Sequence, residues 1–281
     1  MAQICKNFLW GIENDGRRFL CQSWAALSKP KTEGGFDIKE ILSWNKAQAI
    51  KWIRKLETQP HSSGSNGLKP IYLRGTLFGM LKEIDYILAS WNNLLAARTD
   101  LVQQVGLEAA QALLAAMPNS FAAGQVYDLL RSPNPSVPWR YTVYDTAVYP
   151  NHGFVGHLAI QHKLPTIDRF ISRGFQWINR CVLCGAAEES HTHLFFECSW
   201  TAILWSTIQQ VYSFDTHSTH LFNILDWYYV HNRERSWVKK RRRSALLCLL
   251  YYIWQERNTR IFRDKTRTAR SFEFDLCSSK S

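Results

Sequence analysis

The 281-residue sequence has no apolar stretch long enough to cross a lipid bilayer. Its longest apolar run is 245–254, about half of the roughly 20 residues that a membrane-spanning helix needs. Residues 1–10 also lack the apolar core and the small-residue cleavage site of a secretory signal. We therefore expect no membrane partner and an intracellular location, and we interpret 245–254 as part of a buried helix.

Adjacent aspartates are absent as well. The eleven aspartates are isolated along the chain, with no Asp-Asp pair, whereas a polymerase needs paired carboxylates to hold two metal ions for phosphoryl transfer. The Gly34-Gly35 pair has no phosphate-loop spacing around it and is interpreted as a turn. These absences predict a chain with no polymerase catalytic core, no enzymatic activity and no small-molecule substrate.

Alternating polar and apolar residues, which are typical of half-buried strands, are scarce, and no internal repeat is present. Apolar spacing and capping residues instead predict helices over 36–56, 101–117, 167–173, from Ser199 to about 211, and from Ser236 to about 262. Thr166 is expected to cap the third of these helices, with Asp168 in its first turn and Gly174 at its end. The chain is therefore predicted to be mainly α.

Basic residues are concentrated toward the carboxyl end. The net charge is +11, and 231–271 carries 13 basic and 3 acidic side chains, a net of +10, whereas 140–205 carries 5 of each. This balance favours a polyanionic partner, RNA or DNA. Five consecutive bases are the candidate nucleic-acid residues, with nuclear import or a solvated helix end as the other interpretations: Lys239, Lys240, Arg241, Arg242 and Arg243. Three tryptophans lie among bases and are interpreted as core residues rather than base-stacking platforms: Trp44, Trp52 and Trp237.

Three of the seven cysteines cluster with a histidine. The spacing is Cys181-x2-Cys184-x8-His193-x4-Cys198. The CxxC pair places two thiolates on one tight turn, and four thiolate and imidazole ligands suit a tetrahedral zinc ion in a closed structural site. His191 is the competing third ligand, and Gly185 is expected to let the chain leave the CxxC turn at positive φ.

These residues resemble the zinc-binding domain near the carboxyl end of reverse transcriptases of plant LINE-type (non-LTR) retrotransposons. That family pattern is leucine-proline-threonine, a short helix, CxxC, a glutamate, HLFxxC and a tryptophan. The matching residues here are Leu164, Pro165, Thr166, Cys181, Cys184, Glu189, His193, Leu194, Phe195, Cys198 and Trp205. The resemblance selects His193 over His191 as the third ligand. One departure is His157, which replaces the tryptophan that usually precedes the leucine-proline-threonine segment.

Both ends of the chain resemble the same elements. The amino end carries FLWG at 8–11, PKTEGGFDI at 30–38 and WNKA at 44–47, and the carboxyl end carries IWQERNTRIF at 253–262. The resemblance implies that the chain begins after the polymerase core. It also suggests five segments: 1–57, a helical connection after the polymerase; 58–70, a linker; 71–138, a helical region; 139–212, the zinc-binding domain; and 213–281, a basic helical tail.

The expected fold is mainly α, with helical bundle-like segments around a small structural zinc module. The expected function is that of a zinc-binding, nucleic-acid-binding fragment of a retrotransposon reverse transcriptase that has no catalytic core of its own. A zinc-stabilised protein-interaction module and an inert retroelement remnant are the alternatives. The sequence favours neither RNA nor DNA.

Overall fold

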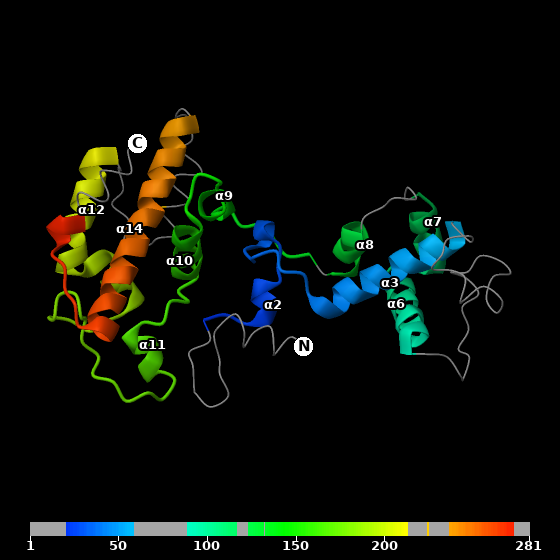
Figure 1. Cartoon of the computed structure of the whole chain (residues 1–281), viewed down its shortest axis with the longest axis horizontal. Coiled ribbons are helices and arrows are strands. Elements are labelled where there is room, and N and C mark those ends of the chain that lie inside the picture. Colours follow the sequence, from blue (N-terminus) through cyan, green and yellow to red (C-terminus); the bar gives the residue numbers. More distant parts are fainter. Residues whose placement is uncertain are drawn as a thin grey trace. The chain divides into compact units, whose positions relative to one another are not determined.

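A computed structural model describes residues 21–58, 89–116, 123–131, 133–212, 224 and 236–272 (Figure 1). These residues are mostly helical and contain no strand, as the sequence predicted. No helix in this part of the chain is both long and apolar enough to span a membrane. Most of the predicted linker 58–70 and the FLWG segment at 8–11 lie outside the described residues.

The described residues fall into two compact units. The first unit takes its residues from 37–135, and the second takes them from 21–36 and from 136–272. The predicted metal ligands and the basic run therefore belong to the same unit. The boundaries of the five segments expected from the sequence stay predictions.

The first unit is built from α3 (Ile41–Thr58), α6 (Ala89–Val105), α7 (Leu107–Ala116) and α8 (Ala123–Leu130). Helix α3 packs against α6 and α8 over a core that contains Ala47, Ile50, Ile53, Ala97, Leu101 and Val126. The predicted start of α3 at residue 36 was wrong, because the carboxylate of Glu40 accepts from the backbone N–H of Leu42 at 3.1 Å and of Ser43 at 2.7 Å. These bonds satisfy the amides of the first turn, so the helix begins at Ile41.

The single helix predicted over 101–117 was also wrong. Gly106 lies at φ +84°, in the left-handed region, and it separates α6 from α7. Its N–H donates to Val102 O at 2.8 Å, and its carbonyl accepts from Ala110 N at 3.0 Å, so the glycine ends one helix and starts the next. Helical periodicity continues across the break, which is why the apolar pattern alone does not reveal it.

The second unit is organised around its longest described helix, α14 (Ser236–Arg263). The other elements are α2 (Trp24–Leu27), η1 (Lys31–Glu33), α9 (Arg140–Val143), α10 (Pro150–Ile160), α11 (Ile167–Ile171), η3 (His193–Glu197) and α12 (Ser199–Tyr212). Helix α14 packs against both α10 and α12 (Figure 1). Residues 245–250 and Ile253 of α14 are buried, which confirms that the longest apolar run forms a buried helix segment.

Helices α10 and α14 approach closely at Gly156. A Cβ atom at this position would lie 2.3 Å from Cδ2 of Leu247, which is fully buried in the core of the second unit. Real carbon atoms do not approach so closely, and the packed core leaves the leucine little room to move. The absence of a side chain at Gly156 therefore sets the spacing between the two helices.

We predict that Gly156→Ala lowers the free energy of unfolding of the second unit by about 1–3 kcal/mol, as overpacked cores do. Leu247→Ala in the same chain should remove the clash, so the double variant should lose less stability than the sum of the two single variants. Denaturant unfolding of the four proteins measures this coupling. Strict additivity would show that the contact is not tight.

The matched control is Gly124→Ala in α8. No atom lies within 4 Å of a Cβ built at this glycine. Alanine favours the helix over glycine by about 0.8–1 kcal/mol, so this variant should be neutral or slightly more stable.

Candidate metal centre

Four side chains of the second unit converge on one point. The ligand atoms of Cys181, Cys184, His193 and Cys198 all lie within 4.8 Å of one another. Sγ of Cys181 is 3.9 Å from Sγ of Cys198, and Sγ of Cys184 is 3.4 Å from Nε2 of His193. Ligands bound tetrahedrally at about 2.1–2.3 Å lie about 3.5–3.8 Å apart. The three thiols and the imidazole thus form a cluster suited to hold a zinc ion.

The CxxC turn is closed by its own backbone. The N–H of Gly185 donates to Cys181 O at 2.8 Å, and the N–H of Cys181 donates to Ala187 O at 2.7 Å. Gly185 lies at φ +67°, as the sequence predicted. The N–H of Ala186 points at Sγ of Cys184 at 3.5 Å, so the backbone of the turn also contacts one of the ligand atoms.

A π-helical turn brings the other two ligands together. In η3, the N–H of Cys198 donates to the carbonyl of His193 at 2.8 Å, a bond between residues i and i+5. In an α-helix these residues would lie about 140° apart around the axis, and their side chains would diverge. The wider turn removes much of that angle, so Cys198 returns to the side of the His193 ring.

His191 has a different environment. Its ring lies 4.1 Å from the ring of His162 and 4.9 Å from that of Phe195, measured between centroids, and it is not a member of the four-residue cluster. Burial, followed by the neighbouring His162, lowers the pKa of His191 to about 3. The residue is therefore a neutral, packed histidine beside the cluster.

Two of the thiols, Cys181 and Cys198, lie within hydrogen-bond distance of each other. The hydrogen bond between Cys181 and Cys198 raises the pKa of Cys181, an effect to which burial adds, and the same bond lowers the pKa of Cys198. Cys198 is thus the more acidic thiol of this pair. Binding of a metal ion by the pair would release protons, so the occupancy of such a site depends on pH.

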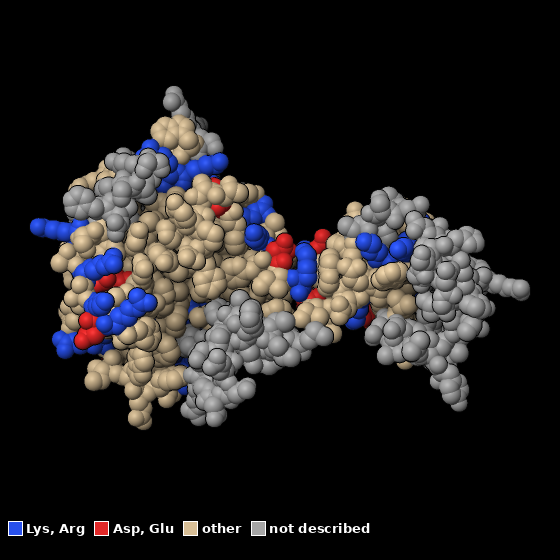
Figure 2. Space-filling model, in the orientation of Figure 1, with Lys and Arg blue, Asp and Glu red and all other residues tan. Residues whose placement is uncertain are grey.

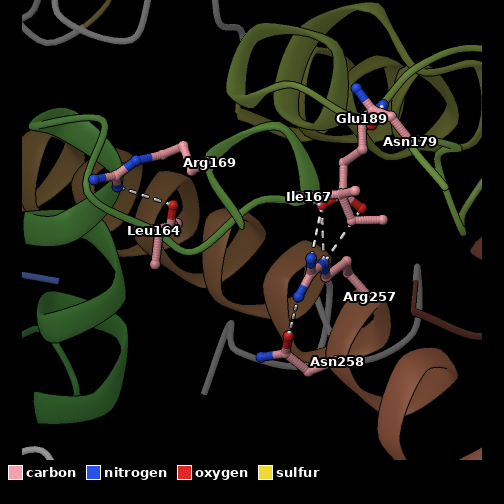
Figure 3. A network of polar contacts seen from close by, with 7 residues as sticks. All are labelled: Leu164, Ile167, Arg169, Asn179, Glu189, Arg257 and Asn258. Atoms are coloured by element: carbon pink, nitrogen blue, oxygen red, sulfur yellow. Dashed lines mark hydrogen bonds and ion pairs between the residues drawn. The ribbon is translucent and has the colours of Figure 1, made fainter. Parts of the chain in front are cut away.

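A buried ion pair joins Glu189, which lies in the segment 181–198 that carries the cluster (the metal loop), to Arg257 of α14 (Figure 3). Glu189 is 0% exposed and Arg257 is 1% exposed. The Arg257 guanidinium donates from Nη2 to Oε1 of Glu189 at 2.7 Å and from Nε to both carboxylate oxygens at 3.2 and 3.3 Å. Oε1 also accepts from the backbone N–H of Ile167 at 2.9 Å, and the N–H of Glu189 donates to Oδ1 of Asn179 at 2.9 Å. One carboxylate therefore ties α11, the metal loop and α14 together.

The predicted side-chain cap of α11 by Thr166 was wrong, because the Glu189 carboxylate takes that role. Thr166 occupies the N-cap position, but its side chain makes no capping hydrogen bond, and the helix ends at Ile171 rather than 173. Glu189 satisfies the first amide of the helix instead, from 22 residues further along the chain. Gly174 lies at φ +85° beyond the helix end.

Arg260 of α14 holds the CxxC turn directly. Its Nη1 donates to the carbonyls of Val182 at 3.1 Å and Leu183 at 2.9 Å. Its Nε donates to Glu256 at 2.8 Å, and that carboxylate is 1% exposed. Arg257 and Arg260 therefore serve the metal loop, although by charge alone they belong to the basic segment 231–271. The glutamate of the family pattern, Glu189, was the one sequence signal that a contact between the metal loop and another segment exists.

His157, the departure from the family pattern, is fully buried in α10. Its Nδ1 lies 2.9 Å from the hydroxyl of Tyr144, which itself donates to Gly35 O. Nε2 of the same ring lies 3.0 Å from the amide nitrogen of Gln161 and 3.2 Å from Oε1 of Gln22, so both ring nitrogens have polar neighbours. Burial lowers the pKa of His157 to about 4. The ring thus replaces an apolar group with a neutral polar one.

The five-base run 239–243 lies in the first turns of α14, where some of its side chains are exposed and others contact neighbouring groups of the chain. Arg242 donates to Tyr212 O at 2.7 Å, and Arg243 donates to Tyr141 O at 3.3 Å and lies 3.6 Å from Asp145. Lys240 and Arg241 are exposed. Figure 2 shows basic side chains gathered near both ends of α14 in the second unit. Only part of the run thus faces solvent.

The tryptophans near bases only partly match their expected core positions. Trp237 is 54% exposed and Trp52 is 48% exposed, so the core interpretation was wrong for both. The guanidinium of Arg241 lies 5.8 Å from the ring centroid of Trp237. Trp44 is half-buried, with its ring 5.8 Å from that of Tyr127 in the first unit.

Comparison with known families agrees with this geometry. Residues 121–205 match the family model described as zinc-binding in reverse transcriptase, and this range contains all four residues of the cluster. The chain therefore contains a zinc-binding domain of the reverse transcriptase type. No curated protein and no solved structure matches the chain.

We predict that Glu189→Gln lowers the free energy of unfolding of the second unit by about 3–5 kcal/mol, because it leaves the Arg257 charge buried without its counter-ion. Glu188→Gln is the matched control, since Glu188 is exposed beside it in the sequence. The control should change stability by no more than about 0.5 kcal/mol. Equal effects of the two substitutions in denaturant unfolding would contradict the role assigned to Glu189.

His157 should make the protein sensitive to mild acid. The unfolded chain binds a proton at its ordinary pKa of about 6.5, whereas the folded chain does so only near pH 4, so stability is complete above pH 6.5 and falls as the pH drops toward 4. Between pH 7 and pH 5 the loss from this residue should be about 2 kcal/mol. His157→Gln should reduce the difference in unfolding free energy between these pH values. An unchanged difference would show that His157 does not cause it.

Proposed function

We propose that this chain is the carboxyl-terminal region of a plant LINE-type (non-LTR) retrotransposon reverse transcriptase, in which it binds nucleic acid beside a polymerase that it does not itself contain. The observation that carries the proposal is the Cys/His cluster inside the matched zinc-binding domain. The resemblance at 30–38, 44–47 and 253–262 supports the narrower family and the position in the element. The lack of an Asp-Asp pair supports a non-catalytic role.

In this proposal Cys181, Cys184, His193 and Cys198 hold one structural zinc ion. Cys181 and Cys198 are fully buried, His193 is 8% exposed and Cys184 is half-buried, so at least three of the four ligands are shielded from solvent. A bound zinc ion would cross-link the CxxC turn to η3. Arg260 and the Glu189–Arg257 ion pair connect this cross-linked region to α14. Zinc therefore serves the fold and not a reaction.

The start of α14 is the proposed nucleic-acid surface. Lys240 and Arg241 offer positive charge to phosphates, and the exposed Trp237 offers a ring on which a base can stack. Arg242 and Arg243 contact the backbone of their own chain and act mainly by their charge. The alternatives are an acidic protein partner docking on the same helix and an inert remnant that binds neither.

The zinc assignment predicts about one zinc ion per purified chain. Cys184→Ser should lose the metal, because three ligands do not close a structural site. Cys248→Ser, which changes a buried cysteine of α14 outside the cluster, should retain it. Metal analysis by mass spectrometry measures the content of each protein.

The two histidines provide a second matched pair. His193→Ala should lose zinc and His191→Ala should keep it. The opposite pattern would identify His191 as the third ligand. Equal zinc content in wild type and Cys184→Ser would contradict the assignment of the four-residue zinc site.

The nucleic-acid proposal predicts a salt-dependent affinity. Each phosphate contact contributes about −0.9 to the slope of log K against log salt on duplex DNA, so replacing Lys240 and Arg241 by glutamine should flatten the slope by about 2 units. Lys51→Gln, at an exposed position of α3 in the first unit, is the control and should leave it unchanged. Fluorescence anisotropy at several salt concentrations, with RNA and with DNA, gives the slopes. An unaltered slope in the double variant would favour the protein-interaction alternative.

A further inference from the structure

A basic cavity lies in the second unit, apart from the start of α14. It has a volume of about 410 Å³, and the residues that line it include Gln22, Ser23, Gln161, Lys163, Arg169 and Arg173. Typical ligand pockets have volumes of about 300–1,000 Å³. The cavity is therefore larger than a lone phosphate ion requires, and it could hold a phosphate together with an attached sugar.

The charged residues of the lining are all basic. Lys163, Arg169 and Arg173 contribute three bases, and none of the lining residues is acidic. The thiol of Cys21, which also lines the cavity, has a pKa raised by burial and adds no negative charge. Burial and, after it, the charge of Arg173 lower the pKa of Arg169. Two guanidinium groups that repel each other in a hollow would both be stabilised by an anion between them.

The polar wall of the cavity is held in place. Gln22 is 5% exposed, and its side-chain amide donates to Oε1 of Gln161. The Gln161 amide nitrogen lies 3.0 Å from Nε2 of His157 and 3.4 Å from Gly34 O. Nη1 of Arg169 donates to Leu164 O at 3.1 Å (Figure 3). These contacts orient the amides and one guanidinium before any ligand arrives, which lowers the entropy lost on binding.

We infer that this cavity binds a phosphate group of a nucleic-acid strand, with Lys163, Arg169 and Arg173 as its cationic ligands. Guanidinium groups match the oxygen geometry of phosphate and bind it through paired hydrogen bonds. The inference rests on the proposed function only for the source of the phosphate. A free nucleotide would present the same chemistry, so the two sources are separated experimentally.

The cavity should differ from the start of α14 in how it binds. Two of its three bases, Lys163 and Arg169, are half-buried and Arg173 is exposed, whereas Lys240 and Arg241 both project into solvent, where salt screens them. The cavity should therefore recognise one phosphate at a defined position. The helix should attract a strand over several phosphates.

Calorimetric titration tests the inference with three probes: inorganic phosphate, adenosine monophosphate and a single-stranded dodecamer. The pocket variant is Lys163→Gln with Arg173→Gln, which leaves the Arg169–Leu164 contact in place. Each lost charge-assisted hydrogen bond weakens binding about tenfold or more, so the pocket variant should bind the dodecamer at least tenfold more weakly than wild type. Lys163→Arg, which keeps the charge, should retain most of the affinity. Unchanged zinc content and circular dichroism check the fold.

The helix variant, Lys240→Gln with Arg241→Gln, separates this inference from the proposed function. If the dodecamer binds wild type and the pocket variant equally well, the cavity is not a phosphate site, and the proposed function stands. If the helix variant binds the dodecamer as well as wild type does and the pocket variant does not, the cavity inference holds and the nucleic-acid surface proposed at α14 is contradicted. Wild type could instead bind adenosine monophosphate tightly and the dodecamer not at all, with the pocket variant losing the nucleotide. This result would overturn the inference that the phosphate belongs to a nucleic-acid strand and would identify a free nucleotide as the ligand. Absence of binding to all three probes by wild type overturns the inference.

Discussion

The carboxylate of Glu189 is fully buried and is shared by three segments that are distant in the sequence. It receives hydrogen bonds from the first amide of α11 and from the guanidinium of Arg257 in α14, while its own backbone belongs to the metal loop. A buried charge is tolerated only when it is paired and hydrogen-bonded. Separation of any of the three segments would therefore expose the Glu189 carboxylate or leave it buried without a partner, at a large cost in stability. The metal loop is therefore not an independent finger. Its geometry depends on α14, and the packing of α14 depends on the loop.

This coupling changes how the basic character of the chain is understood. The segment 231–271 has a net charge of +10, yet Arg257 neutralises Glu189, and Arg260 binds Glu256 and the CxxC carbonyls. Arg243 lies beside Asp145. The exposed bases of this segment lie at its two ends, Lys240 and Arg241 near the start and Arg263, Lys265, Arg267 and Arg270 near the end, and the cavity beside α11 adds bases from outside the segment. A count of bases along the sequence overstates the surface on offer to nucleic acid.

Local signals in the sequence predicted the local features. The CxxC…H…C spacing predicted the cluster, Ser199 and Ser236 predicted the starts of α12 and α14, and Gly185 predicted the positive φ. Two of the failures are local as well, and the third comes from a contact between distant segments. Glu40 delays the start of α3, Gly106 interrupts an unbroken apolar pattern, and Glu189 replaces Thr166 as the partner of the first α11 amide. The Glu189–Arg257 contact spans 68 residues, and no periodicity or capping rule encodes a pair at that separation.

The contacts of Glu189, Arg257 and Arg260 imply that the zinc-binding loop and α14 are stabilised together. Hydrogen exchange with mass spectrometry, with and without a zinc chelator, measures this directly, because amide protection reports the free energy of local opening. Removal of zinc should speed exchange in residues 245–260 of α14 as well as in 181–198, while α3 and α8 of the first unit should stay protected. Exchange in α14 that is the same in both conditions, with loss of protection confined to the loop, would contradict this joint stabilisation.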